Sequence, residues 1–165
     1  MASTLFPRVC VAAEGQMLEV RIPRRLESPN TWNGRHWRYK HRISQEWESA
    51  IGGAFYEQIA GAPRDFVTAL GCMVGPRKWE GIIVGRQRVE VERHVPSVRN
   101  FIRDDDNLRF AVKPLLDALK RQGYIKNDSR KWLDHPTPTQ HVSANGKDYT
   151  VIRISPVELA MRQAT

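Results

Sequence analysis

Residues 103–131 read RDDDNLRFAVKPLLDALKRQGYIKNDSRK, and the expected architecture is built around this segment. Its apolar residues recur at the three- and four-residue spacing of a helix with one buried face, namely Leu108, Ala111, Val112, Leu115, Leu116 and Leu119. We therefore expect a helix over residues 107–122, capped by Asp106 or Asn107. Gly123 stands where a helix commonly ends.

Segments typical of strands flank this helix on both sides. Alternating apolar and polar residues predict strands at residues 8–12, 17–23, 66–74, within 82–95 and at 148–155. We expect further helices over residues 42–60 and 156–164, and a loop over residues 28–41, which are rich in turn formers. Because the main elements run roughly β-α-β-β-α-β, we expect a single α/β (α+β) domain over residues 1–165, with a mixed β-sheet and about two main helices.

Charged side chains line the face of the 107–122 helix that lies opposite its apolar face. At about 100° per residue, Lys113 and Asp117 each fall within about 20° of Asp106. Pro114 makes this row approximate, because proline disfavours helix at the preceding residue and can kink a helix or start a new one. Asp128 follows the helix and can reach this row only if the chain folds back.

Two of the three consecutive aspartates are expected to share one face. In an extended segment alternate residues point the same way, so Asp104 and Asp106 point together. Two carboxylates about 4 Å apart repel by roughly 4 kcal/mol at an effective dielectric near 20, and a proton or cation relieves this repulsion. Mg²⁺ prefers such oxygen ligands. It can activate water for phosphodiester hydrolysis while a nearby lysine stabilises the developing charge.

Each of these residues also has a purely structural interpretation. An aspartate run before a helix commonly caps it and matches its dipole. Lys113 and Asp117 have the spacing of an ordinary surface ion pair, and Asp128 could be a turn residue. From spacing alone, capping and metal binding both remain open.

Three motifs in the right order, DxDNL, KxxxDAL and G-x-I-x-x-DS, resemble the RusA family of Holliday junction resolvases, which is common in phages and prophages. The matching residues are Asp104, Asp106, Asn107 and Leu108, then Lys113, Asp117, Ala118 and Leu119, then Gly123, Ile125 and Asp128. The segments 28–30 and 36–37 resemble the start of the family pattern, and residues 150–154 resemble its closing strand. The resemblance covers about residues 17–155.

The resemblance implies a small α/β homodimer that cuts four-way DNA junctions with Mg²⁺, for which Mn²⁺ can substitute. It implies that Asp104, Asp106 and Asp128 are catalytic and hold the metal, and that Lys113 is the catalytic lysine. This chain departs from the family in two places. Asn127 stands where many members carry the first aspartate of a pair, and the interval from Asp106 to Lys113 is longer than in the shortest members.

The charge of the chain favours a polyanionic partner. Its 26 Lys and Arg residues against 18 Asp and Glu residues give a net charge of +8. Much of this excess lies in residues 21–42, where Trp32, Trp37 and Tyr39 interleave with the basic side chains. Cations contact phosphates, and aromatic faces can stack on exposed bases. The candidate DNA-binding residues are Arg35, His36, Trp37, Arg38, Lys40 and Arg42. The alternative is a solvated basic loop whose tryptophans pack inward.

Several other classes of protein are disfavoured. We expect no membrane association and a cytoplasmic location, because no apolar run approaches about 18 residues and the N-terminal sequence lacks the pattern of a secretory signal. The two cysteines form no CxxC motif, and the five histidines show no zinc-ligand spacing. Two hypotheses compete with a nuclease: a non-catalytic basic DNA-binding protein, specific for junctions or single strands, and a basic phage structural or assembly protein.

Overall fold

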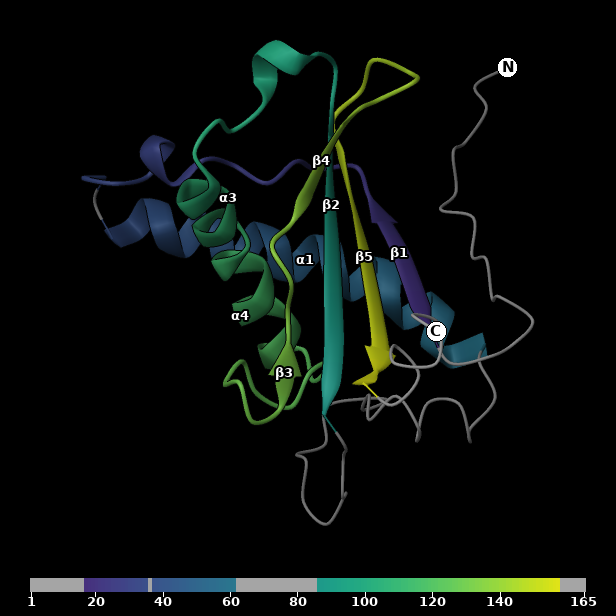
Figure 1. Ribbon diagram of the computed structural model, residues 1–165. Coiled ribbons are helices and arrows are strands. Elements are labelled where there is room, and N and C mark those ends of the chain that lie inside the picture. The colour runs from purple at the N-terminus through teal and green to yellow at the C-terminus, as the bar shows by residue number, and fades with distance from the viewer. Residues whose placement is uncertain (1–16, 36, 62–85, 158–165) are drawn as a thin grey trace.

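The computed structural model describes residues 17–35, 37–61 and 86–157. In chain order the elements are β1 (Leu18–Ile22), the 3-10 helix η1 (Pro29–Thr31), α1 (Trp37–Gly61), β2 (Gln87–Val95), the 3-10 helix η2 (Val98–Asn100), α3 (Asp105–Ala111), α4 (Lys113–Arg121), β3 (Leu133–Asp134), β4 (Thr139–Val142) and β5 (Tyr149–Pro156). Figure 1 shows the strands side by side, with helices packed against them. The expected mixed α+β fold is confirmed.

The described strands form a five-stranded mixed sheet. Its order is β1-β5-β2-β3, and β4 also pairs with β2. β5 is antiparallel to both β1 and β2, whereas β3 and β4 run parallel to β2. Val20, Val91 and Ile152 lie in register across β1, β2 and β5, and all three side chains are buried. Alternation along each strand therefore directs one face of the sheet into the core.

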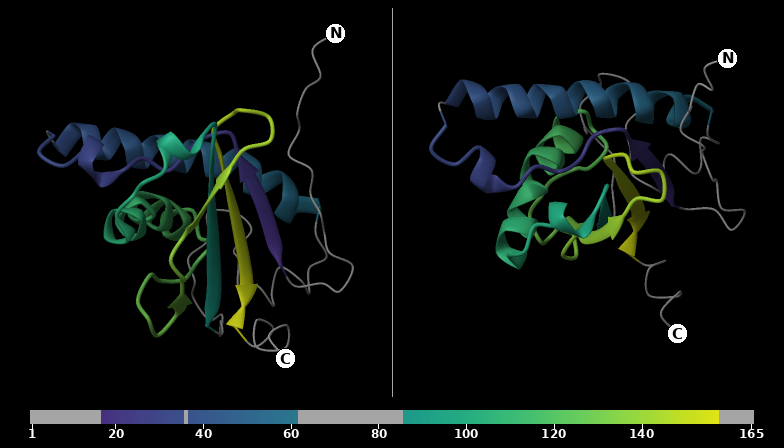
Figure 2. Two further views of the ribbon diagram at one scale, coloured as in Figure 1. Left: turned by 45° about the horizontal axis from the view of Figure 1, so that its top comes forward. Right: turned by 90° about the horizontal axis from the view of Figure 1, so that it is seen from above.

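The helices cover this apolar face. Trp47 and Ile51 of α1, Leu115 of α4 and Val89 of β2 belong to one cluster of buried side chains. Figure 2 shows α1 crossing the sheet while α3 and α4 lie beside it. Each helix buries its apolar stripe against this core. As a result, the start of α1 lies near the polar side of α3 and α4, and residues of all three helices line one cleft.

The long helix α1 begins earlier than the sequence predicts. Residues 37–41, expected in a loop, form its first turn, and η1 lies inside the same expected loop. The apolar pattern is weak at this start, because Trp37 and Arg38 are exposed, Tyr39 is only half-buried against the core, and the first fully buried side chain of the helix is that of Ile43. The pair Gly52-Gly53 does not interrupt the helix, which continues to Gly61.

The expected single helix over residues 107–122 is two helices. α3 ends at Ala111, Val112 lies between the two, and Pro114 stands in the first turn of α4, where its missing N–H costs no hydrogen bond. The cap of α3 is Asp104, not Asp106 or Asn107. Asp104 has extended backbone angles, and its Oδ1 accepts the N–H of Asp106 at 2.9 Å.

The remaining expectations have mixed outcomes. The strands predicted at 17–23 and 148–155 are confirmed as β1 and β5, and β2 occupies most of the predicted 82–95 segment. The helix expected from residue 156 begins one residue later, because Pro156 still pairs in β5 with Gln87 of β2 and Val157 is helical. The strands expected at 8–12 and 66–74, and residues 158–164, lie outside the described residues.

A buried polar network fixes the segment that leads into α3. Arg93 of β2 donates hydrogen bonds to the carbonyls of Leu26 and Asn100, each at 2.8 Å, and to Gln140 Oε1 at 3.0 Å. The Gln140 amide in turn accepts the N–H of Ile102 and donates to its carbonyl, each at 2.9 Å. These contacts anchor the chain two residues before Asp104.

Candidate active site

The aspartate run lies at the start of α3, where all three side chains are exposed. Both oxygens of Asp104 have protein partners: Oδ1 accepts the N–H of Asp106, and Oδ2 accepts the Asn107 side-chain amide at 3.0 Å. The capping interpretation is therefore confirmed for Asp104. Asp105 and Asp106 lie in the first turn of the helix, where their negative charge suits its dipole. They do not continue the extended segment in which Asp104 and Asp106 were expected to point together.

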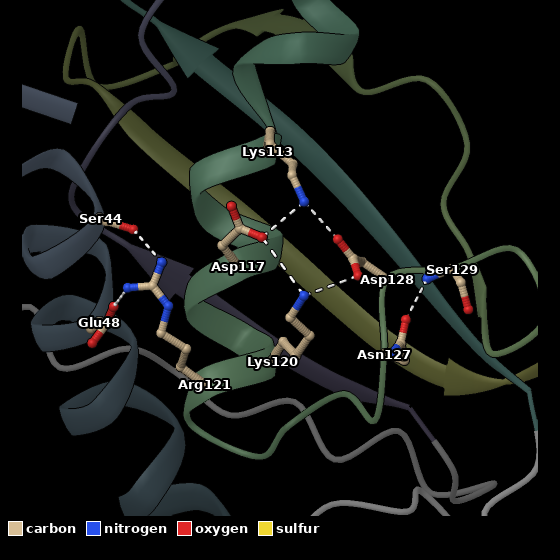
Figure 3. Close-up of polar contacts among 9 residues, drawn as sticks. All are labelled: Ser44, Glu48, Lys113, Asp117, Lys120, Arg121, Asn127, Asp128 and Ser129. Carbon is tan, nitrogen blue, oxygen red and sulfur yellow. Dashed lines mark hydrogen bonds and ion pairs between the residues drawn. The ribbon is translucent and has the colours of Figure 1, made fainter. Parts of the chain in front are cut away.

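Four charged side chains, Lys113, Asp117, Lys120 and Asp128, form what we call the charged quartet (Figure 3). Lys113 Nζ donates to Asp117 Oδ1 at 2.8 Å and to Asp128 Oδ2 at 2.5 Å. Lys120 Nζ donates to Asp128 Oδ1 at 3.0 Å and lies 4.0 Å from Asp117 Oδ1. The structure thus brings Lys113 and Asp128 together, as the motif order suggests.

A short return of the chain places Asp128 beside α4. Gly123 has a φ of +80°, a conformation that glycine adopts without the strain other residues would suffer, and it ends the helix. The Gln87 side chain of β2 then donates to the carbonyl of Tyr124 and accepts the N–H of Lys126, each at 3.1 Å. Asn127 Oδ1 accepts the N–H of Ser129 at 2.9 Å and closes a turn around Asp128. Asn127 therefore serves the turn in which Asp128 is held.

The electrostatics of the charged quartet follow from these contacts. Hydrogen bonds from Lys113 and then Lys120 hold the pKa of Asp128 well below its usual range. Partial burial lowers the pKa of Lys113, but hydrogen bonds to Asp117 and Asp128 outweigh it, so its pKa is raised overall. At neutral pH Lys113 and Asp128 are therefore both charged, and Lys113 presents its ammonium at the surface.

The three predicted metal ligands are not gathered at one point. Among residues 17–35, 37–61 and 86–157, no group of three His, Cys, Asp or Glu side chains is placed to hold a metal ion. Asp104 caps α3, whereas Asp128 faces two ammonium groups. As a donor set, three carboxylates fit Mg²⁺, because this cation takes oxygen ligands. Metal binding requires Asp104 and Asp128 to exchange their present partners, and the metal site stays a prediction.

A cleft of about 680 Å³ opens beside the charged quartet, and we call it the α1–α4 cleft. Lys113 and Asp117 line it from α4, Lys40 lines it from α1 and Asn107 lines it from α3. Asn107 also lines a second cleft of about 590 Å³ that contains Asp104. Lys113 and Asp117 therefore border one cleft and Asp104 borders the other, while Asn107 lines both.

The described candidate DNA-binding residues lie at or just before the start of α1, and Lys40 among them lines the α1–α4 cleft. Arg35 precedes α1, and the exposed residues Trp37, Arg38, Lys40 and Arg42 lie on its first turns. His36 lies outside the described residues.

Several of these cations make cation–π contacts with aromatic rings. The guanidinium groups of Arg35 and Arg42 lie 5.9 and 4.9 Å from the centre of the Tyr39 ring, and that of Arg38 lies 5.7 Å from the Trp37 ring. Trp32, in contrast, is buried in the core. The inward-packed alternative therefore holds for Trp32 but not for Trp37.

Sequence reasoning missed two groups of residues at this site. Lys120 stands seven residues after Lys113, a spacing that puts both on one face of α4, so the signal was present. Phe110, His41 and Arg121 also line the α1–α4 cleft. They belong to three different helices: Phe110 to α3, His41 to α1 and Arg121 to α4. Only the packing of these helices brings the three side chains together.

Comparisons with known proteins add no further constraint. A scan against protein-family models finds no match, and a search of curated proteins finds no similar sequence. Within the described ranges, none of the helices has the length and apolar character needed to cross a membrane.

Proposed function

We propose that this protein is a Mg²⁺-dependent, structure-selective endodeoxyribonuclease that resolves Holliday junctions or other branched DNA by symmetric phosphodiester hydrolysis. The observation that carries the proposal is Lys113, held between Asp117 and Asp128 on the wall of a basic cleft. The ordered motifs around Asp104, Lys113 and Asp128, which resemble RusA-type resolvases, support the same conclusion. A homodimer suits this reaction, because two-fold symmetry supplies two equivalent sites for paired cuts.

The side chains of the site have two roles: one stabilises negative charge on the phosphate, and another holds the first in position. Lys113 offers a fixed ammonium to the phosphate, whose negative charge increases in the transition state. Asp117 holds that ammonium on the cleft side of α4, so Lys113 stays in place when Asp128 changes partner. When bound by Asp104, Asp106 and Asp128, Mg²⁺ would supply an activated water and stabilise the leaving oxygen.

DNA binding is assigned to the start of α1 and the residue before it. Arg35, Arg38, Lys40 and Arg42 are exposed cations, and Lys40 lines the cleft. Contacts from such residues to phosphates fix the register of the DNA without reading its sequence. We therefore expect the shape of the substrate to govern binding more than its sequence.

A non-catalytic junction- or single-strand-binding protein is the second candidate. The observation that favours it is that Asp104 caps a helix and Asp128 is paired with two lysines, so both have structural uses. This protein would use the same basic surface and would need no metal. Binding assays alone do not separate the two candidates, because both predict retention of branched DNA.

Cleavage of a synthetic four-way junction, with Mg²⁺ or with EDTA, separates them. We expect nicking by the wild-type protein with Mg²⁺ only. Asp106→Asn should keep junction binding and abolish nicking, whereas the matched change Asp105→Asn should retain it. Full Mg²⁺-dependent nicking by the Asp106 variant would refute the site assignment. Retention of the junction by the wild type without nicking under any divalent metal would favour the binding protein.

The mass of the protein in solution tests the proposed homodimer. Light scattering after gel filtration should give twice the mass of 19.0 kDa at assay concentration. A strict monomer, both free and bound to the junction, would contradict paired cutting by two symmetric sites.

A further inference from the structure

Phe110 is an apolar side chain in an unusual place. It belongs to α3, whose buried face is formed by Leu108 and Ala111, yet its own side chain is 65% exposed. It lines the α1–α4 cleft together with Lys113. Another exposed large apolar residue, Val98, does not line this cleft. An exposed aromatic ring beside the proposed catalytic lysine is a candidate contact for a ligand with a flat apolar face.

The charge of the α1–α4 cleft indicates an anionic ligand. Lys40, Lys113 and Arg121 line it, whereas Asp117 is the only carboxylate among its described lining residues. Arg121 is held by Glu48 and by Ser44 Oγ at 3.0 Å, and Lys113 by the charged quartet (Figure 3). Lys40 has no side-chain partner within the described ranges, so it is available to a phosphate.

The cleft also has the size and polar groups of a ligand site. Its volume of about 680 Å³ lies within the roughly 300 to 1,000 Å³ typical of small-molecule pockets. The side-chain amide of Asn33 lines it and makes no hydrogen bond in the described part of the chain, so it can donate to and accept from a base edge. An aromatic face, an amide and an exposed cation together match the base and phosphate of one nucleotide.

We propose that the α1–α4 cleft binds one unpaired nucleotide at the branch point of DNA, with its base stacked on Phe110 and its phosphate beside Lys40 and Lys113. This inference rests on the proposed function in taking DNA as the ligand. Bases within a duplex are already stacked on one another, so a base reaches Phe110 only where the helix is interrupted. Phe110 thereby selects branched DNA over continuous duplex and delivers the adjoining phosphate to Lys113.

Binding of a four-way junction tests this assignment in EDTA, where cleavage is prevented. The junction carries a fluorescent adenine analogue at the branch point, and a duplex of the same length and sequence serves for comparison. Because stacking of one base on an aromatic side chain contributes about 1–3 kcal/mol, Phe110→Ala should weaken junction binding by about 5- to 150-fold. The same change should abolish the fluorescence change on binding and leave duplex binding unaltered.

Two further variants make the result interpretable. Phe110→Trp retains an aromatic face and should restore both the junction preference and the fluorescence change. Val98→Ala removes an exposed apolar side chain outside the cleft and should behave as wild type. The assignment is overturned if Phe110→Ala keeps the wild-type preference for junction over duplex, or if the analogue never responds to the wild-type protein. It is also overturned if Phe110→Ala converts a dimer to a monomer, because Phe110 would then contact a second copy.

Failure of this inference and failure of the proposed function give different results. A protein that engages the fluorescent base through Phe110 but never nicks DNA would retain the cleft assignment and lose the nuclease. A protein that nicks junctions with Mg²⁺, while Phe110→Ala leaves binding unchanged, would retain the nuclease and lose the cleft assignment.

Discussion

Replacing Asp128 with asparagine tests the electrostatic account of the charged quartet. The change keeps the size of the side chain and removes the charge that pairs with Lys113 at 2.5 Å and with Lys120 at 3.0 Å. Lys113 keeps Asp117 at 2.8 Å, whereas for Lys120 the same carboxylate lies 4.0 Å away. The variant therefore strips Lys120 of its close partner and leaves Lys113 with one of two.

The magnitude follows from the exposure of the paired groups. The side chains of Lys113 and Lys120 are 55% and 36% exposed, and that of Asp128 is 23% exposed. Surface ion pairs of this kind contribute about 0.2–1 kcal/mol each, so we expect Asp128→Asn to lower the free energy of unfolding by about 0.5–2 kcal/mol at pH 7.

The pH dependence of this loss has a definite sign. Lys113 and Lys120 lower the pKa of Asp128 in the folded protein. The stabilisation is therefore complete well above the pKa of an unfolded aspartate, about 3.9, and disappears as the pH falls through the lower pKa of the folded state. The difference between wild type and variant should be constant at pH 6–7 and shrink below about pH 4.

Urea unfolding followed by tryptophan fluorescence measures this difference. It should be recorded from pH 7 to the lowest pH at which the wild type remains folded, with Val98→Ala as an exposed, uncharged control outside the quartet. A difference that stays constant below pH 4 would refute the ion-pair account. A loss above about 4 kcal/mol at pH 7 would also refute it, because a loss of that size is typical of leaving a buried charge unpaired and exceeds that of a surface ion pair.

Three other changes test the core, the cap of α3 and the proposed DNA contacts. Trp47→Ala removes a fully buried side chain and should cost about 3–5 kcal/mol in urea unfolding, and a cost below about 1 kcal/mol would contradict its place in the core. Asp104→Ala removes the cap of α3 and should cost about 1 kcal/mol of stability, whereas Asp104→Asn should keep most of it. Lys40→Ala combined with Arg42→Ala should reduce the slope of log binding constant against log salt by about two, and an unchanged slope would exclude phosphate contacts there.

Local patterns predicted the longer strands and the presence of helices in these segments, although not the start of α1 or the break between α3 and α4. Alternation in β1, β2 and β5 reflects one buried face, and that pattern is visible over five or more residues. β3 and β4 were missed because two and four residues are too few to show a period. Their backbones are extended because they pair with β2, which lies far from both of them in the sequence.

The candidate site also has one contact that local spacing predicts and one that it does not. The Lys113–Asp117 pair follows from four-residue spacing on one helix. The contact between Lys113 and Asp128 depends on Gly123 ending the helix and on Gln87 holding the return segment. No pattern local to residues 103–131 contains Gln87, so the order of the motifs could suggest this contact but no local spacing could predict it.

By itself, the sequence determined the mixed α+β class, the basic charge and the side chains available for chemistry around Lys113. Each of these depends on composition or on periods of two to four residues, which local backbone geometry imposes. Only the tertiary structure decided that Asp128 pairs with two lysines and that Phe110 lines a cleft with Lys40. The physical reason is that these contacts follow from burying the apolar faces of α1 and α4 against one sheet, which joins segments far apart in the chain.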